Sequence, residues 1–399
     1  MIVRNLIFKF ISVSVGFSLS FLILEIFARF APATDVFPLE RPIKCDLSKP
    51  ITLNCLHRKR PYTKGKWSAG KIYPFNQVAI KSTNDIGQFS NIDLKEFILN
   101  KDKYMQVISI GDSYVEAKQV KNSLTFHGLL NKKETLDKEK IISTSIASAG
   151  MAFPNYIAQI EFIRNSIDLD KTILIIPIIG NDFDESFLRY GLKGRRGGLG
   201  QFYFKENSSD LTFIPYPKKI NNIQSFIDFI LKNSAISRYL TYNLDLGRLI
   251  KHNLRFFTQK DFNKKNYANN IIESKRVDSP KRYELGELAI YKFLNYLNTL
   301  RVDPSLNKNT FLIVDADREA IYNNQEIDTN SFYQVMRKKF IKKAKDLGFT
   351  VIDLKLAYEN DFARNKRMFN SIYDYHWNDY GHNLVSEQIL NEINNISFR

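Results

Sequence analysis

Short apolar runs alternate with segments of helical periodicity along most of this chain. Runs rich in Val, Ile, Leu and Phe occupy residues 107–110, 141–146, 172–179, 311–315 and 349–354. Each run predicts a strand that is buried on both faces. Apolar residues at helical spacing lie between or after these runs, at 115–131, 155–167, 283–300, 331–347 and 380–394. The alternation predicts an α/β fold in three α/β/α layers, built on a five-stranded parallel sheet with right-handed crossovers.

An earlier apolar stretch, at residues 6–30, precedes the alternating region. Only Lys9, Glu25 and Arg29 interrupt it, so it is long enough for one membrane-spanning helix whose basic side chains reach the interface. A cleaved signal peptide is the alternative, because Ala-Pro-Ala at 31–33 resembles a small-residue cleavage site. The proline makes that site a poor one, which favours an uncleaved signal anchor.

The short basic N-terminus, with Arg4, predicts that this end stays in the cytoplasm. The chain would then be a single-pass membrane protein whose main part is extracytoplasmic, in a periplasm or at the cell surface. On this interpretation residues 1–31 are the cytoplasmic tip and transmembrane anchor, and 32–100 form an extracytoplasmic lead segment. Residues 101–399 form the main domain, with an insertion at 184–280 where the alternation is lost.

Positive charge is in excess, since 58 Lys and Arg residues against 42 Asp and Glu residues give a formal net charge of +16. Such an excess suits nucleic acid, an anionic membrane face or an acidic glycan. We find no nucleic-acid-binding motif and therefore expect no nucleic-acid partner; protein partners stay unknown. With 44% hydrophobic residues, the chain can bury a large core.

The two cysteines of the chain, Cys45 and Cys55, lie close together in the lead segment. In an oxidising compartment they could form a disulfide that closes a small loop. A metal site would need more ligands than the neighbouring His57 can supply, and two unrelated buried thiols are a third interpretation. The disulfide agrees best with an extracytoplasmic location.

Polar or glycine residues stand where the predicted strands end and where the last helix begins. Ser113 follows the first strand in a Gly-Asp-Ser turn, Gly150 follows the second, Asn181 follows the third, and Asp374 and His376 precede the last helix. The carboxyl ends of parallel strands share one edge of a sheet, and ligands bind there. We therefore expect these side chains to lie close together.

In this order and on this strand pattern, the residues resemble the SGNH hydrolases, also called the GDSL esterase and lipase family. The resemblance covers residues 104–394 apart from the insertion, and the block 374–382 is similar to the membrane-anchored bacterial members. It implies a flavodoxin-like sheet and an activity on ester bonds. The sequence around Gly150 departs from the family in lacking an Asn-x-Gly pattern, and the insertion is not a general family feature.

The chemistry assigns a role to each residue. A serine hydroxyl needs a base to take its proton, and His376 suits that role for Ser113. Asp374 can hold the imidazole in one tautomer and stabilise its protonated form. By resemblance, the oxyanion hole would consist of the Ser113 N–H, the Gly150 N–H and the Asn181 amide. Taken singly, each residue has a structural alternative, such as a packed histidine, a helix cap or a turn residue.

The insertion follows directly after an expected active-site loop. It contains a glycine-rich basic run with Arg195 and Arg196, then a predicted aromatic hairpin around Tyr203, and a helical pattern at 223–251. It could serve as a lid or substrate platform, with these three side chains as candidate substrate-binding residues. The alternative is a surface excursion whose aromatic residues form a small core of their own.

Three hypotheses for function follow. The first is an extracytoplasmic serine esterase that removes O-acyl groups, including O-acetyl, from a carbohydrate or another cell-envelope substrate. The second is an O-acyltransferase that uses the same site to acylate an envelope polysaccharide. The third is a non-catalytic envelope glycan-binding protein that grips an acidic polymer by charge and stacking. No metal-ligand spacing, phosphate-binding glycine loop or dinucleotide fingerprint occurs, so we expect no metal and no cofactor.

Overall fold

The computed structural model describes residues 2–30, 33–68, 78–187, 199–208, 210–216, 222–244, 279–371 and 375–396. The chain divides into two compact units. Unit 1 contains residues 1–37, 65–80 and 219–264, and unit 2 contains residues 38–64, 81–218 and 265–399.

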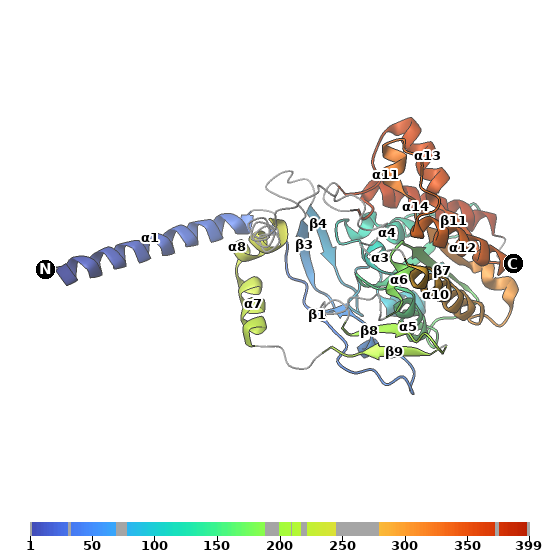
Figure 1. Ribbon diagram of the computed structural model, residues 1–399, viewed down its shortest axis with the longest axis horizontal. Helices are drawn as coiled ribbons and strands as arrows, with labels where there is room; N and C mark the ends of the chain where they lie inside the picture. The colour runs from blue at the N-terminus through green and yellow to red at the C-terminus, as the bar shows by residue number, and fades with distance from the viewer. Residues whose placement is uncertain are drawn as a thin grey trace. The chain divides into compact units, whose positions relative to one another are not determined.

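Unit 2 is built on a parallel sheet of five strands in the order β11-β10-β7-β5-β6 (Figure 1). The strands are β5 (Met105–Gly111), β6 (Ile141–Ala147), β7 (Thr172–Ile178), β10 (Thr310–Val314) and β11 (Thr350–Asp353). They coincide with the apolar runs of the sequence, so the predicted α/β fold is confirmed. The chain passes from β5 outward to β6 and then returns to the other side of β5. The order therefore reverses between β5 and β7, where sheets of this kind bind ligands outside their carboxyl ends.

Helices cover both faces of the sheet because alternate strand residues point to opposite sides. In β5, Ile108 and Ile110 belong to one core cluster, and Val107 belongs to the other. The first cluster includes residues of α2 (Leu94–Leu99), α5 (Phe153–Ile163), α10 (Pro280–Asn298) and α12 (Phe332–Asp346). The second includes residues of α3 (Ser113–Glu116), α4 (Phe126–Leu130), α13 (Leu354–Asn365) and α14 (Asp379–Asn395).

Shorter helical turns complete unit 2 and lie mostly in the connections. They are η1 (Leu53–Cys55), η2 (Asn122–Leu124), α6 (Asp182–Glu185), η6 (Pro304–Asn309) and α11 (Arg318–Tyr322). Of these, α6 follows β7 and η6 precedes β10, so both lie at ends of the central strands.

The single helix expected over residues 115–131 is wrong, because two short helices, α3 and α4, occupy this region with η2 between them. Ala117 has a φ of 43°, a left-handed conformation that ends α3. The buried Lys81 ammonium donates to the carbonyl groups of Ala117 and Val120 at 3.0 and 2.9 Å. A continuous helix would use these carbonyl groups internally. A lysine that is distant in sequence therefore stabilises the break.

The aromatic hairpin predicted in the insertion is confirmed, since β8 (Gln201–Phe204) pairs antiparallel with β9 (Leu211–Ile214). Strand β8 is buried and is bonded to α5. The Asn155 side-chain amide donates to the Phe202 carbonyl at 3.2 Å, and the Phe202 N–H donates to Asn155 Oδ1 at 3.0 Å. Phe202 and Phe204 also belong to the core cluster of the first sheet face. The hairpin is therefore an integral part of the core of unit 2.

The lead segment of unit 2 contains a disulfide between Cys45 and Cys55. Its strands β1 (Leu39–Glu40) and β2 (Arg58–Lys59) pair antiparallel. At Gly87, which has a φ of 77°, an added Cβ would lie 1.9 Å from the Lys59 carbonyl oxygen. Only glycine permits this approach, which fixes β2 against the turn at Gly87. A second two-stranded sheet pairs β3 (Lys64–Ser68) with β4 (Val78–Ser82), and residues 65–68 and 78–80 of these strands belong to unit 1.

Unit 1 contains the long helix α1 (Ile2–Phe30), of which Ile7–Phe30 has the length and composition of a membrane span. It also contains α7 (Asn222–Asn233), α8 (Ala235–Arg238) and the π-helical turn η4 (Tyr239–Asn243). The helix expected over 223–251 is interrupted at Ser234, whose hydroxyl caps α8 by accepting the Ser237 N–H at 3.1 Å. Residues 245–251 of that expected helix lie outside the described residues.

Candidate active site

Ser113 lies at the turn from β5 to α3. At Gly111, an added Cβ would come within 2.5 Å of Val115 Cγ2, so the close packing of α3 on the strand end requires glycine. Asp112 caps α3, because its Oδ1 accepts the Tyr114 N–H at 2.8 Å. These constraints place Ser113 half-buried at the carboxyl edge of the sheet, beside the point where the strand order reverses.

His376 meets Ser113 from the loop that precedes α14. Its Nε2 lies 2.7 Å from Ser113 Oγ, within hydrogen-bond distance, although the two residues are 263 positions apart. The Ser371 N–H donates to the His376 carbonyl at 2.9 Å, and the Tyr114 ring centroid lies 4.9 Å from that of the imidazole. Both the backbone and the ring of His376 are therefore held in place.

Three other predicted site residues, Asp374, Arg195 and Arg196, lie outside the described residues, so their expected roles stay predictions. Across the described ranges, no group of three or more His, Cys, Asp or Glu side chains could hold a metal ion.

A buried acid, Asp315, supports both members of the Ser113–His376 pair. It forms an ion pair of 3.1 Å with Arg318, and both side chains are 4% exposed. Its Oδ1 accepts the indole N–H of Trp377 at 3.3 Å, and Arg318 donates to the Tyr114 hydroxyl at 2.8 Å. Tyr114 and Trp377 directly follow the two residues of the pair. The network therefore fixes the neighbour of each.

The sequence alone does not reveal this role of Asp315. An aspartate after a strand is also an ordinary turn residue, and nothing local distinguishes the two cases. The one available signal is Arg318 three positions later, a spacing that allows an ion pair within a helical turn.

Gly150 lies in the loop after β6 with a φ of 76°, a conformation that glycine adopts without strain. Hydrogen bonds hold this loop from two directions. The Ala149 N–H donates to Glu116 Oε2 at 3.0 Å, and the Gly150 carbonyl accepts from Gln201 Nε2 at 3.2 Å. Gln201 Oε1 in turn accepts from the Tyr203 hydroxyl at 3.2 Å. The insertion hairpin thus contacts the candidate oxyanion loop directly.

Tyr203, a candidate substrate-binding residue, is only 2% exposed. Burial, with Glu185 nearby, raises the pKa of its phenol to about 12. The side chain therefore stays a neutral hydrogen-bond donor and reaches the Gly150 loop through Gln201. A contact with substrate stays a prediction for this residue.

Glu116 belongs to a second buried ion pair. Its carboxylate pairs with the Lys59 ammonium of the lead segment, and the two side chains are 1% and 4% exposed. Lys118 Nζ lies 3.4 Å from the other carboxylate oxygen. Burial lowers the pKa of Lys59 well below its usual value, and Lys118 and Lys81 lower it further. Through Glu116, the lead segment supports the loop that carries Gly150.

Asn181 immediately precedes α6, and its side-chain amide donates to Glu185 Oε2 at 3.2 Å. An amide group has two N–H donors, so this bond uses one of them. The next residue, Asp182, accepts the Tyr156 hydroxyl at 2.8 Å. Burial raises the pKa of Asp182 well above its usual value, and the neighbouring charge of Asp112 adds to the rise. Asp182 is therefore a buried turn acid behind Asn181.

No protein-family model and no curated protein matches this chain. Its fold is similar to that of a two-domain esterase active on acetylated mannans, with 11% identity, a TM-score of 0.36 and coverage of 76% of this chain and 53% of the esterase. This chain thus spans about half the length of that protein. The lipase Lip_vut3 from a goat rumen metagenome has 14% identity, a TM-score of 0.33 and coverage of 72% and 97%. The psychrotrophic esterase EstA from Pseudoalteromonas sp. has 11% identity and a TM-score of 0.31, and the match covers 73% of this chain and 97% of EstA.

Proposed function

We propose that this chain is a membrane-anchored, extracytoplasmic serine esterase of the SGNH type. Its substrate would be a carbohydrate or another cell-envelope molecule that carries O-acyl groups, including O-acetyl. The observation that carries the proposal is the 2.7 Å contact between His376 Nε2 and Ser113 Oγ at the carboxyl edge of the sheet. A serine hydroxyl within reach of an imidazole base is what nucleophilic acyl transfer requires.

In this proposal, His376 takes the hydroxyl proton as Ser113 Oγ attacks the acyl carbonyl carbon. The tetrahedral intermediate then expels the sugar oxygen, which receives that proton from the imidazolium, and an acyl-serine remains. Water, deprotonated by the same imidazole, attacks the carbonyl carbon of the acyl-serine. Ser113 Oγ then leaves, taking the proton from the imidazolium, and a carboxylic acid is released. Asp374 would orient the imidazole and stabilise its protonated form.

The proposed oxyanion donors are the N–H groups of Ser113 and Gly150 and an N–H of the Asn181 amide. Donors of this kind are effective when their position is fixed before the reaction, because no reorganisation is then needed. The hydrogen bonds of Ala149 to Glu116 and of Gly150 to Gln201 support such preorganisation. They hold the peptide groups on both sides of the Gly150 N–H.

The extracytoplasmic location is supported by two features. The apolar part of α1 has the length and composition of a membrane span. The Cys45–Cys55 disulfide lies in the lead segment, and disulfides persist in oxidising compartments. A periplasmic or cell-surface active site would meet acylated envelope glycans directly.

The test uses the purified full-length chain in detergent and a chromogenic acetyl ester, with and without a polysaccharide acceptor. We expect ester hydrolysis that needs no acceptor. Turnover that appears only when the polysaccharide is present, with acetyl recovered on it, would instead identify an O-acyltransferase with the same site. A folded protein that turns over the ester under neither condition would contradict the proposal and favour a glycan-binding role.

A further inference from the structure

Helix α7 of unit 1 has an apolar side that is exposed. Phe226, Ile227 and Phe229 are 63%, 42% and 64% exposed. Around the helix axis Phe226 lies between Ile227 and Phe229, so the three side chains occupy one half of the helix surface. Lys232 lies in the other half, next to the edge marked by Phe229. Large apolar side chains that gather in this way mark an interaction surface rather than a water-facing one.

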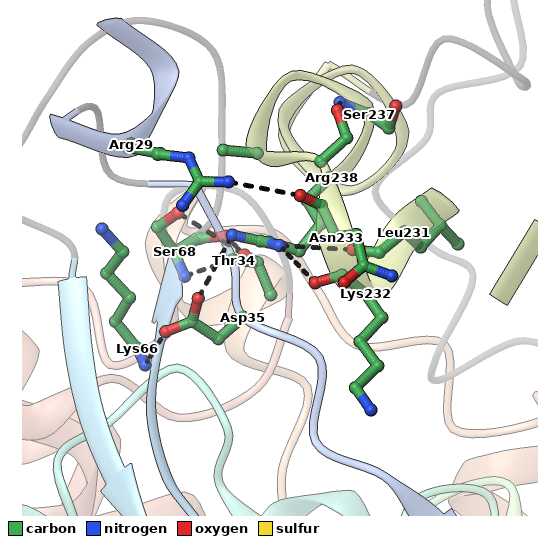
Figure 2. Close-up of polar contacts among 12 residues, drawn as sticks. Arg29, Thr34, Asp35, Lys66, Ser68, Leu231, Lys232, Asn233, Ser237 and Arg238 are labelled. Carbon is green, nitrogen blue, oxygen red and sulfur yellow. Dashed lines mark hydrogen bonds and ion pairs between the residues drawn. The ribbon is translucent and has the colours of Figure 1, made fainter. Parts of the chain in front are cut away.

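The C-terminal end of α7 is hydrogen-bonded to the C-terminal end of α1. Arg29 of α1 donates to the Asn233 carbonyl at 3.4 Å, and Arg238 donates to the carbonyls of Leu231 and Lys232 at 3.3 and 3.2 Å (Figure 2). The last carbonyl groups of a helix have no partner within it. Here two arginines supply the partners, and one of them belongs to α1.

Glu25 of α1 caps α8, the helix that follows α7. Its Oε1 accepts the Ala235 N–H at 2.8 Å, and its Oε2 accepts the Ser234 hydroxyl at 2.9 Å and the Ile236 N–H at 3.1 Å. The first N–H groups of α8 are thus satisfied by a carboxylate of α1. The junction between α7 and α8 is therefore fixed to the C-terminal turns of α1.

The length of α1 places this junction relative to a bilayer. At about 1.5 Å per residue, residues 6–24, which are mostly apolar and have Lys9 near their start as their one charged residue, span about 28 Å, close to the roughly 30 Å thickness of a hydrocarbon core. Glu25 then lies at the boundary of the hydrocarbon, and Arg29 lies among the headgroups. Figure 1 draws α7 across the direction of α1 rather than along it. A helix attached here and running across a membrane span lies along the membrane surface.

We propose that α7 is an interfacial membrane helix whose Phe226, Ile227 and Phe229 insert at the boundary of the acyl chains. The proposal depends on α1 spanning the membrane, which is part of the proposed function. A bilayer is the occupant because α7 is hydrogen-bonded to the end of the span, and because the Arg29 side chain beside it is 62% exposed and suits phosphate headgroups. Amphipathic helices with exposed Phe on one side bind interfaces in this way.

The test uses the full-length chain in nanodiscs of phosphatidylcholine and phosphatidylglycerol. Single variants Phe226→Cys, Phe229→Cys and Lys232→Cys carry an NBD label, which the native cysteines do not take because they form a disulfide. Phe17→Cys, within α1 and 76% exposed, is the control for insertion of the span. Quenching is measured with lipids that carry a doxyl group high on the acyl chain, and separately with aqueous iodide.

We expect doxyl lipids to reduce the emission of labels at 17, 226 and 229, and iodide to reduce only that of the label at 232. Quenching of 226 and 229 by iodide alone would place α7 in water and overturn the proposal. Protection of both positions from both quenchers would overturn it in favour of a protein partner, including a second copy of this chain. A label at 17 that doxyl lipids do not quench would show that α1 does not span the membrane, which would also contradict the proposal. None of these readouts depends on esterase activity.

Discussion

Two buried ion pairs support the candidate active site in different ways. The Asp315 pair, formed by Asp315 and Arg318, comes from one strand-to-helix turn and holds the residues next to Ser113 and His376. The Glu116 pair, formed by Glu116 and Lys59, joins α3 to the distant lead segment and holds the loop of Gly150. One pair is local in sequence and supports the proposed nucleophile and base. The other is long-range and supports the loop of a proposed oxyanion donor.

The two pairs also differ in their surroundings. Asp315 accepts hydrogen bonds from Trp377 and Tyr358, so its charge is well satisfied in the core. Lys59 lies near the further positive charges of Lys118 and Lys81, and its pKa is lowered well below the usual value. A buried charge that loses its partner is strongly destabilising, unless it can become neutral. The Asp315 pair should therefore control stability and geometry together, and the Glu116 pair mainly the rate.

The largest effect should come from Ser113→Ala, which removes the proposed nucleophile. We expect ester hydrolysis to fall by at least about 10⁴-fold, because the remaining residues can only bind and polarise the ester. The measurement is kcat on the chromogenic ester. Ser109→Ala is the matched control, since this serine lies in the same strand and its buried hydroxyl has no hydrogen-bond partner among the described residues. Equal activity of wild type and Ser113→Ala would exclude the proposed chemistry.

Asp315→Asn should have the next largest effect, because it leaves Arg318 buried without its partner charge. Breaking a buried pair in this way destabilises a protein by about 3–5 kcal/mol. We expect a lower melting temperature and a lower kcat, since Trp377 and Tyr114 lose their common support. Thermal unfolding and kinetics of the same preparation give both values. A variant that loses neither stability nor activity would show that this network does not position the pair.

Glu116→Gln tests whether the Glu116 pair supports the loop of Gly150, which carries a proposed oxyanion donor. Removing a complete oxyanion donor lowers kcat by about 10²–10³-fold, so loosening the loop that carries one should have a smaller effect, about tenfold. We expect KM to change little, because the loop acts on the transition state. The double variant Lys59→Met/Glu116→Gln also removes the amine left without its partner, and its kcat should stay as low as that of Glu116→Gln. Recovery of kcat would mean that the unpaired lysine, and not the loosened loop, lowers the rate.

Acid should weaken the lead segment. Burial lowers the pKa of His57 to about 4, and Arg41 adds to the shift, whereas the unfolded side chain titrates near 6.5. The folded state therefore binds the proton less readily, and stability present above pH 6.5 is lost as the pH falls toward 4. The loss is about 1.4 kcal/mol per pH unit, so it is about 1.4 kcal/mol at pH 5.5.

Thermal unfolding at pH 7.5 and 5.5 measures this loss, and His57→Gln is the comparison. The buried His127 and His382 also have lowered pKa values, so the wild type should lose more stability than His57→Gln but both should lose some. Identical pH dependence of the two proteins would show that His57 does not carry the acid sensitivity of the lead segment.

The smallest effect is expected for Tyr203→Phe. The change removes the hydroxyl that donates to Gln201, a hydrogen bond with a net contribution of about 1 kcal/mol. We expect kcat on the small ester to fall by a few-fold at most. If Tyr203 instead contacts a sugar, KM for an acetylated glycan should rise while kinetics on the small ester stay unchanged. Comparing the two substrates distinguishes these roles.

The architecture could be predicted because strands that are buried on both faces consist mostly of apolar residues. Ser113, Gly150 and Asn181 could be placed at one edge for the same reason, since each follows such a run. His376 was assigned from the resemblance of its block, and the structure brings it to Ser113. Local patterns and short motifs are thus sufficient to predict the sheet and the Ser113–His376 pair.

The supports of the site could not be predicted, because they depend on burial and on partners distant in sequence. Lys59 and Lys81 lie in a polar lead and look like surface residues, yet both are fully buried. Lys81 also breaks the helix that the apolar spacing of 115–131 predicts, by binding its carbonyl groups. Such tertiary contacts override the helical periodicity of the sequence and cannot be detected from the spacing of apolar residues.

The contact between Ser113 and His376 has a consequence for the timing of activity. The two residues are 263 positions apart, and His376 lies just before α14. A ribosome therefore makes the proposed nucleophile long before the proposed base. Until His376 has been made and α14 has docked on the sheet, the serine would have no base beside it, so a nascent chain would be inert.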